Sequence, residues 1–213
     1  EAPPRGRGWV PVYGVTSLLL SGLPLFAIAV GLLVVGWAAA GARTLAGAIG
    51  RGALVLAPAT LLSLGVFALI PLVAVRLLAI GMTPGHHPVR SRVGWQVWTT
   101  ERLLDSARTF LFPLYASLLT PGWLRLLGAD IGKDVEASTV LMVPKFTTVG
   151  DGAFLADDTM VASYELGGGW MMIGQAKVGK RAFLGNSGMA AAGRRVPKNG
   201  LVAVLSAAPA KSK

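Results

Sequence analysis

The sequence predicts two transmembrane α-helices followed by a left-handed parallel β-helix built from hexapeptide repeats. Two long stretches, residues 8–42 and 52–75, contain no charged side chain. Each exceeds the roughly 20 apolar residues that a helix needs to cross a bilayer core. From Ile131 onward, aliphatic residues recur at every sixth position. This period matches neither an α-helix nor a single strand, but it is typical of parallel β-helices.

The composition favours a membrane protein over an ordinary soluble domain. Of the 213 residues, 53% are hydrophobic and 14% are charged, and the mean hydropathy is +0.60. The net charge of +10 would also suit nucleic acid, but several cations flank the apolar stretches, as in membrane proteins. We therefore expect membrane lipid, and no nucleic acid, as a partner. Because there is no cysteine and the two histidines are adjacent, no metal site is expected.

The two apolar stretches predict a transmembrane helical hairpin within residues 1–82. The first span covers about residues 9–41 and the second about residues 53–81, with GARTLAGAIGRG as the connection. Proline and glycine inside the spans are compatible with this prediction, since membrane helices tolerate both. The chain begins with Glu, and we expect it to be a piece of a longer protein.

The distribution of arginines predicts the orientation of the hairpin. The connection carries Arg43 and Arg51. The outer flanks carry Arg5, Arg7, Arg76, Arg90 and Arg92. Because cytoplasmic segments are enriched in Lys and Arg, both ends of the hairpin are expected in the cytoplasm. The sequence therefore predicts an integral protein of the plasma membrane with a cytoplasmic β-helix domain.

Residues 83–127 are predicted to form interfacial or linker helices. After a Pro/Gly turn, WQVWTTERLLDSARTFLFPLYASLL has apolar residues at helical spacing. Thr99 or Thr100 is the expected N-cap and Pro113 the expected kink. The aromatic side chains suit a helix at the membrane surface, or one packed on the domain below. A short helix at residues 123–127 is expected to cap the β-helix.

The sixfold repeat is expected to occupy residues 128–206, before a tail at residues 207–213. Counting by six, with a one-residue slip, aligns thirteen positions, of which ten are Val, Leu or Ile. These positions are Ile131, Ala137, Val143, Val149, Leu155, Val161, Gly167, Ile173, Val178, Leu184, Ala190, Val196 and Val202. Each repeat is expected to form one short strand with its aliphatic side chain pointing inward. Three repeats make a triangular coil, so the chain has roughly four coils.

Two features interrupt or decorate the ladder. Glycine follows five of the ten Val, Leu or Ile positions, where the chain turns a corner and backbone room and a positive φ would favour it. The segment SYELGGGWMM breaks the rhythm and is expected to bulge from one face.

Five segments, taken in order, resemble a known family. They are PGHHPVRSRVGWQVW, LLTPGWLRLLGADIGKDV, TTVGDGAFLADDTMV, VGKRAFLGNSGMAAAGRRVP and VAVLSAAP. Together they resemble the membrane-bound C-terminal region of non-ribosomal peptide synthetases of the ε-poly-lysine synthetase type. In that family an adenylation domain and a carrier domain precede six spans, which alternate with three tandem soluble domains. The resemblance implies that this chain is one tandem unit that contributes to acyl transfer and isopeptide bond formation between amino acids.

The resemblance also implies a substrate and partners. An aminoacyl group would arrive on the phosphopantetheine arm of a carrier domain, with no cofactor bound directly by this chain. Sibling β-helix domains of the same polypeptide would complete a pseudo-trimer, with the active site between neighbouring β-helices. Hexapeptide acyltransferases generally use a histidine there, yet the repeats contain none. An ordinary acetyltransferase mechanism is therefore not expected.

Four residues are the catalytic candidates. Amide formation from a thioester needs a group that takes the proton of the amine and donors for the oxyanion. Asp157 and Asp158 follow a ladder residue at a coil edge, and Glu165 lies in the bulge. Each carboxylate could hold a lysine-like ammonium or accept its proton, although the two aspartates could equally form a solvated turn. His86 could reach the groove from the linker, or belong to a surface loop.

Four further residues are candidates for substrate binding. Asn186 and Ser187 follow a glycine of the ladder, where they would donate hydrogen bonds in a groove or form an asparagine rung. Arg194 and Arg195 would meet a phosphopantetheine phosphate or lipid headgroups, or form a solvated corner. Two other functions stay open. The first is a non-catalytic scaffold repeat of the same assembly. The second is a membrane-anchored hexapeptide acyltransferase that acts on sugar or lipid.

Overall fold

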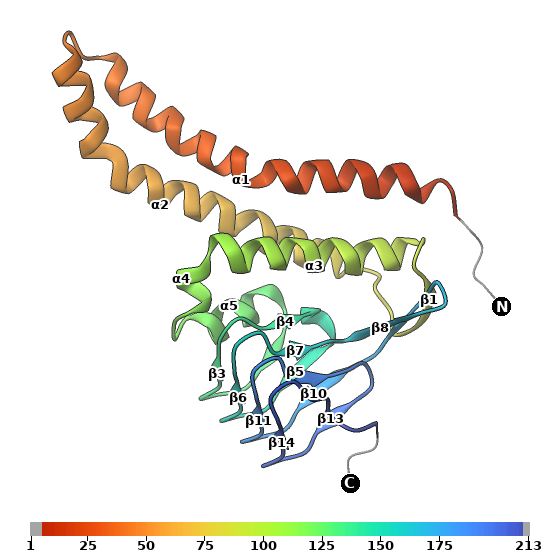
Figure 1. Ribbon diagram of the computed structural model, residues 1–213. Helices are drawn as coiled ribbons and strands as arrows, with labels where there is room; N and C mark the ends of the chain where they lie inside the picture. The colour runs from red at the N-terminus through yellow and green to blue at the C-terminus, as the bar shows by residue number, and fades with distance from the viewer. Residues whose placement is uncertain (1–5, 211–213) are drawn as a thin grey trace.

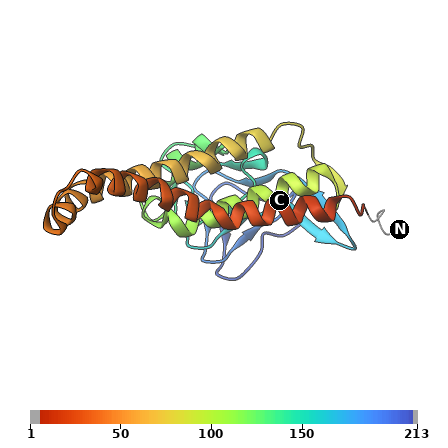
Figure 2. The same ribbon diagram turned by 90° about the horizontal axis from the view of Figure 1, so that it is seen from above.

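The N-terminal part of the protein is a hairpin of two long apolar helices (Figure 1). The computed structural model describes residues 6–210, so Arg5 and the last three residues of the tail lie outside the described residues. α1 spans Trp9–Ala40 and α2 spans Leu45–Leu78, and both are long and apolar enough to cross a membrane. Seen from above, the closed end of the hairpin projects well beyond the rest of the chain (Figure 2).

The connection between α1 and α2 is shorter than the sequence predicted. Only residues 41–44 are non-helical, because Thr44 is the N-cap of α2 and its Oγ1 accepts a hydrogen bond from the Gly47 N–H at 3.1 Å. The helix then runs through Arg51 into the second apolar stretch. α1 contains Pro24 and changes direction near its middle (Figure 1). A proline removes one helical hydrogen bond and is a common cause of such a kink.

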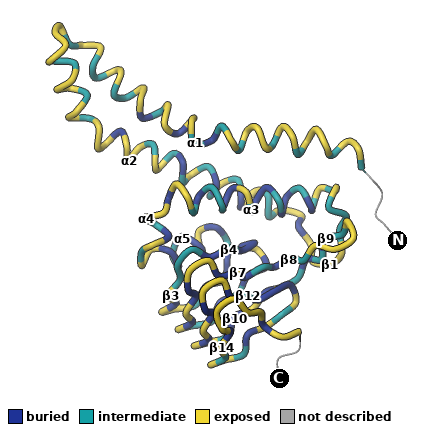
Figure 3. The backbone as a smooth tube through the Cα atoms, viewed as in Figure 1, coloured by how far each residue is buried: buried dark blue, intermediate teal, exposed yellow. Residues whose placement is uncertain are grey.

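Small residues let the two helices approach closely. A Cβ added to Gly31 would lie 2.2 Å from Ser63 Oγ and 3.0 Å from the Ala59 carbonyl oxygen. Away from this seam most of the large apolar side chains are exposed, including Leu18 at 76% and Leu54 at 80% (Figure 3). The hairpin therefore presents a wide apolar surface that the rest of the chain does not cover.

α3 (Arg92–Phe110) lies between the hairpin and the strands (Figure 1). Its Trp98 ring meets Tyr13 of α1 edge to face, with ring centroids 4.9 Å apart. Its N-cap is Ser91, whose Oγ accepts a hydrogen bond from the Gly94 N–H at 3.2 Å. The predicted N-caps, Thr99 and Thr100, are wrong. Both lie buried inside the helix, which starts at Arg92, seven residues before Thr99.

Two short helices follow. The helix α3 ends at Phe110, and Pro113 lies in the first turn of α4 (Phe112–Tyr115) instead of kinking one continuous helix. Proline suits this position because its missing N–H would have no helical partner there. α5 (Thr120–Leu127) includes the helix predicted at residues 123–127 and covers one end of the strands (Figure 1).

Short parallel strands in three sheets form most of the rest of the chain, here called the parallel-sheet domain (residues 130–202). The first sheet contains β2 (Asp130–Ile131), β5 (Thr147–Val149), β10 (Ala176–Val178) and β13 (Arg195–Val196). The second contains β3 (Glu136–Ala137), β6 (Phe154–Leu155), β11 (Phe183–Leu184) and β14 (Leu201–Val202). The third contains β4 (Leu141–Met142), β7 (Met160–Val161) and β12 (Met189–Ala190). The chain passes through the three sheets in turn, and one passage through all three is here called a coil. Parallel partners such as Ile131 and Val149 therefore lie 18 residues apart.

The inward ladder holds for most of the predicted positions. Six of them are at most 1% exposed: Val149, Leu155, Val161, Leu184, Ala190 and Val196. Three predicted positions are wrong. Met142, and not Val143, pairs with Val161, because the 3₁₀ turn at Pro144–Phe146 shifts the chain by one residue. Gly167 and Ile173 lie outside the ladder altogether.

The segment that broke the rhythm is an antiparallel hairpin of β8 (Tyr164–Gly167) and β9 (Trp170–Ile173). The free edge of β9 pairs with β1 (Gly85–Pro88), which precedes α3, so an additional three-stranded sheet extends from the domain (Figure 1). Because of this insertion, Val178 follows its partner Val149 by 29 residues instead of 18. The difference of 11 residues is one fewer than two six-residue repeats, which explains the one-residue slip in the sixfold count.

Close approach of neighbouring coils explains the glycines that follow ladder residues. A Cβ on Gly179 would lie 2.6 Å from the Lys198 backbone nitrogen, and a Cβ on Gly150 would lie 2.7 Å from that of Lys180. Positive φ occurs two positions later, as at Arg181 with 53°. The expectation that a positive φ selects these glycines is therefore wrong. Backbone proximity selects them, because any side chain would meet main-chain atoms that have no room to move.

Candidate functional site

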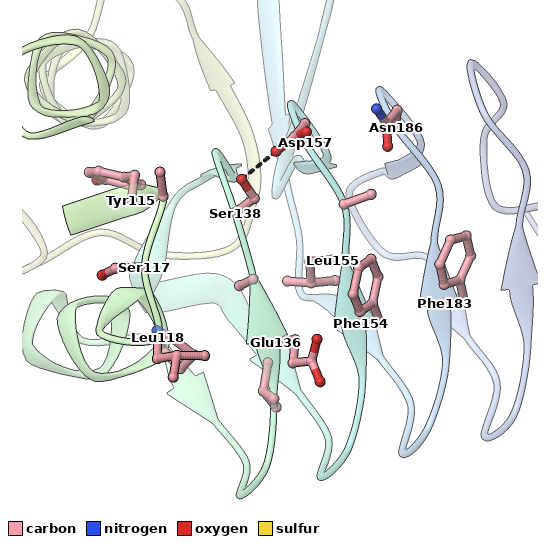
Figure 4. Close-up of a pocket in the computed structure, with 15 residues that line it drawn as sticks. Tyr115, Ser117, Leu118, Glu136, Ser138, Phe154, Leu155, Asp157, Phe183 and Asn186 are labelled. Carbon is pink, nitrogen blue, oxygen red and sulfur yellow. Dashed lines mark hydrogen bonds between the residues drawn. The ribbon is translucent and has the colours of Figure 1, made fainter. Parts of the chain in front are cut away.

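A cavity of about 680 Å³ opens on the outer face of the second sheet (Figure 4). Its floor is a row of outward side chains from adjacent strands: Glu136 on β3, Phe154 on β6 and Phe183 on β11. The end of α4, at Tyr115, and the segment after it, with Leu118, form one wall (Figure 4). The cavity therefore combines residues from the helical linker with residues from three successive coils.

The floor is aromatic with a carboxylate at one end. The rings of Phe154 and Phe183 stack at a centroid distance of 5.3 Å and an angle of 10°, and both are about two-fifths exposed, at 40% and 39%. Glu136 stands next to Phe154 in the same row. Aromatic faces and carboxylates both attract cations, so this surface suits a positively charged group.

A row of polar corner residues forms the rim. Ser138 Oγ donates a hydrogen bond to Asp157 Oδ1 (Figure 4). Asn186 lies at the same edge one coil further on (Figure 4), and within residues 6–210 its side-chain amide has no partner. The structure thus brings together two residues that the sequence had singled out, Asp157 as a carboxylate and Asn186 as a donor.

Tyr115 makes the wall of the cavity rigid. Its side chain is 1% exposed, and its hydroxyl accepts a hydrogen bond from Trp123 Nε1 at 2.9 Å. Burial raises the pKa of Tyr115 to about 12, although the hydrogen bond from Trp123 acts in the opposite direction. The phenol therefore stays neutral near pH 7 and is a buried structural part of the wall rather than a base.

Asp158 does not line the cavity, although it adjoins Asp157. Its Oδ1 accepts a hydrogen bond from Arg108 of α3 at 3.2 Å, and Arg108 also binds Asp105 at 2.7 Å. The backbone at Asp158 has a φ of 53°, so the chain turns sharply between the two carboxylates. Asp158 is therefore a link between α3 and the parallel-sheet domain.

Replacing Asp158 by Asn is expected to lower the free energy of unfolding only slightly and to leave the cavity unchanged, because the side chain lies outside it. Asn tolerates the left-handed backbone of this position. The lost ion pair should cost about 1 kcal/mol or less, since the Asp158 side chain is 66% exposed. Thermal unfolding of the variant and of the unmodified chain would check this value. A loss of more than about 3 kcal/mol, as for a broken buried ion pair, would contradict this placement.

His86 and Glu165 lie on the antiparallel sheet, away from the cavity. Both pair with Met172 of the central strand β9, one from β1 and the other from β8. Side chains in register share a face, but strands two apart are separated by roughly 9–10 Å. The imidazole and the carboxylate are therefore brought to one surface without direct contact between their strands.

Arg194 and Arg195 also lie outside the cavity. Arg194 donates hydrogen bonds to Glu165 Oε1 at 3.5 Å and to the Ala208 carbonyl oxygen at 2.8 Å. Arg195 stands beside Lys177 on the first sheet. Ser187 forms a corner with a φ of 52°, and its N–H donates to the Asp157 carbonyl oxygen at 3.0 Å. Of the four predicted binding residues, Asn186 therefore lies on the cavity rim and Ser187 at a corner. The two arginines lie outside the cavity.

Comparison with known proteins gives one relative by sequence. A δ-poly-L-ornithine synthetase of Acinetobacter baumannii is 36% identical over 126 residues, which cover 59% of this chain and 10% of the relative. The chain spans about a tenth of the length of the curated relative that it matches. No protein-family model matches the sequence.

One solved structure was also matched, the native serine acetyltransferase 1 of Entamoeba histolytica. The match covers 84% of this chain and 75% of that one, with 9% identity and a TM-score of 0.23. A superposition of this quality does not establish a shared fold. The part of the chain similar to the ornithine polymer synthetase is therefore the finding that bears on function.

Sequence reasoning missed Glu136, Phe154 and Phe183, which form the floor of the cavity. Each directly precedes an inward residue of the ladder and so points outward, because side chains alternate along a strand. This outward row was visible in the sequence one position ahead of the ladder. Phe183, however, aligns with Phe154 only when the inserted hairpin is taken out of the count.

The β8–β9 hairpin is anchored to α3 by a contact that depends on pH. Tyr164 donates its hydroxyl hydrogen to Glu101 Oε2 at 2.7 Å. Burial, with the hydrogen bond to Glu101 and its negative charge, raises the pKa of Tyr164 well above its usual value. Because the folded pKa is the higher one, this contribution to stability is complete below about pH 10 and is lost as the pH rises further.

Replacing Tyr164 by Phe should therefore remove part of the alkaline loss of stability. We expect the unmodified chain to lose more melting temperature between about pH 9 and pH 11.5 than the Phe variant does. Thermal unfolding at a series of pH values would test this. Parallel curves for the two proteins would show that Tyr164 does not contribute.

Proposed function

We propose that this chain is one unit of a membrane-bound synthetase that joins amino acids through side-chain amino groups, and that its cavity binds the incoming amine. The strongest support is the meeting of Glu136, Asp157 and a stacked phenylalanine pair in one cavity. Carboxylates beside aromatic faces favour an ammonium group. Similarity to a relative named for δ-poly-L-ornithine supports a diamino acid of the ornithine or lysine kind as the substrate.

The cavity supplies groups for each part of amide formation. The proposed acyl donor is an amino acid held as a thioester on the phosphopantetheine arm of a carrier domain. Glu136 and the aromatic floor would hold the side-chain ammonium, and Asp157 would take its proton as the nitrogen attacks the thioester carbon. The carbon–nitrogen bond forms, the carbon–sulfur bond breaks, and the carrier thiolate takes up the second proton that the nitrogen loses. Asn186 would donate to the oxyanion.

The hydrogen bond from Ser138 supports the role of Asp157. It fixes one carboxylate oxygen, and within residues 6–210 the other oxygen has no partner. A carboxylate held in this way can meet an amine without first losing another ligand. Ser138 would therefore act as a positioning residue for Asp157.

We also propose that the three sheets are the faces of a left-handed parallel β-helix and that sibling domains complete the site. The 18-residue register between parallel partners supports the first part. Exposed apolar residues at the mouth of the cavity and beside it, Leu118 at 93% and Leu201 at 71%, support the second. Arg194 and Arg195, which face elsewhere on this chain, would then meet the carrier phosphate at the cavity of a neighbouring domain.

The hairpin would anchor this unit in the plasma membrane, with the parallel-sheet domain in the cytoplasm. The wide apolar surface of α1 and α2 supports insertion. Arg76 in the last turn of α2, followed by Arg90 and Arg92, supports the orientation. Extraction of membranes with alkaline carbonate, followed by protease treatment of sealed vesicles, would test both parts.

Binding of the amine tests the proposed function directly. The chain, purified in detergent, would be titrated by calorimetry with L-ornithine methyl ester and with L-norvaline methyl ester, which has the same carbon chain without the terminal amine. We expect the ornithine ester to bind at least about tenfold more tightly and the Glu136→Gln variant to lose that difference. Asp134→Asn, at an exposed corner outside the cavity, is the control. Equal binding of the two esters would favour a scaffold role instead.

A further inference from the structure

A second cavity, of about 540 Å³, lies between α1, α2 and α3. Most of its lining is aliphatic and comes from the two long helices: Leu19, Leu20, Leu23, Ile70 and Leu77. Polar residues of α3 line it as well, namely Arg92, Trp95 and Gln96. The cavity is therefore an amphipathic groove, and its polar residues lie near the start of α1 and the end of α2.

The polar end contains groups without partners. Arg92 and Gln96 are four residues apart on α3 and share one helix face. Gln96 is 3% exposed, and its Nε2 donates to the carbonyl oxygens of Leu78 at 2.8 Å and Ile80 at 2.9 Å. Its Oε1 is buried and unpaired, as is Oγ1 of Thr99. Within residues 6–210 the exposed Arg92 guanidinium has no ion-pair partner.

We infer that this groove binds one glycerophospholipid. Its phosphate meets the Arg92 guanidinium, and a hydroxyl or ammonium group of its head donates to Gln96 Oε1, which is otherwise a costly buried acceptor. An acyl chain lies against the leucines of α1 and α2. Trp95 stands at the junction of the two regions, the position that tryptophan favours in membrane proteins. The inference rests on insertion of α1 and α2 in a bilayer, and it is independent of amide formation.

The headgroup chemistry makes the inference testable. Phosphatidylglycerol and phosphatidylethanolamine carry a hydrogen-bond donor, whereas phosphatidylcholine has none. The full chain, purified in detergent, would be incubated with each lipid at equal acyl composition and measured by native mass spectrometry. We expect one bound phosphatidylglycerol or phosphatidylethanolamine per chain, phosphatidylcholine weaker by at least about tenfold, and no displacement by inorganic phosphate. Equal retention of phosphatidylcholine, or displacement by phosphate, would overturn the inference.

Matched variants locate the bound lipid. Arg92→Gln should weaken retention by about tenfold, whereas Arg90→Gln, at an exposed cation outside the groove, should not. Ala74→Phe places a ring in the groove and should abolish binding. Leu69→Phe, at an exposed position of the same helix outside the groove, should retain it. Binding that survives both Arg92→Gln and Ala74→Phe would refute the site. Since none of these residues lines the first cavity, such a result would leave the proposed function standing.

Discussion

Replacing Asp157 by Asn is expected, on the proposed function, to lower polymer formation by the intact protein about a hundredfold or more, the usual range for loss of a general base. The amide keeps the size of the side chain and can still accept the hydrogen bond from Ser138, but it cannot take a proton from the attacking amine. The measurement is the initial rate of polymer formation at saturating amino acid and ATP.

The neighbouring position supplies the control for this effect. Asp158 has the same side chain, one residue away, but binds Arg108 and lies outside the cavity. We therefore expect Asp157→Asn and Asp158→Asn to differ by at least about fiftyfold in rate while unfolding at similar temperatures. Equal rates for the two variants would rule out Asp157 as the proton acceptor.

Replacing Gly179 by Ala is expected to destabilise the parallel-sheet domain by about 3 kcal/mol or more, at the upper end of overpacking effects. The new Cβ would lie 2.6 Å from the Lys198 nitrogen and 2.7 Å from the Pro197 carbonyl carbon. Both are main-chain atoms of the next coil, so two stacked coils would have to separate. The melting temperature in detergent should fall by roughly 6–12 °C.

Gly167 is the matched control for this substitution. It lies in the inserted hairpin, has no heavy atom within 4 Å of an added Cβ and is not in the positive φ region. Gly167→Ala should therefore leave the melting temperature within about 2 °C of the unmodified chain. A similar loss for both variants would mean that general loss of glycine flexibility, and not coil contact, controls stability.

The residues that form the site could not be aligned from the sequence, because an inserted hairpin interrupts the sixfold repeat. The hairpin β8–β9 adds a length close to two repeats, so a sixfold count passes through it with a slip of one residue. The count placed Gly167 and Ile173 on the ladder, whereas the strands resume the register only at β10. With that register unknown, the alignment of Phe183 with Phe154 and Glu136 was hidden.

The sequence by itself determined the two apolar helices and most of the inward ladder. Both follow from local patterns: a long stretch without charge, and an aliphatic residue at every sixth position. Side chains such as Leu155 and Leu184 are buried because their own strand and its neighbours repeat that environment. No distant segment was needed to predict it.

Only the tertiary structure decided which polar residues meet. Asp157 and Asp158 are adjacent in sequence, yet one faces the cavity and the other binds Arg108, fifty residues earlier. His86 lies on the same sheet as Glu165 because β1 pairs with β9, with His86 opposite Met172, 86 residues further along the chain. Such contacts depend on where α3 and the β8–β9 hairpin pack against the parallel-sheet domain. They join side chains that are far apart in the sequence, so a local repeat pattern cannot predict them.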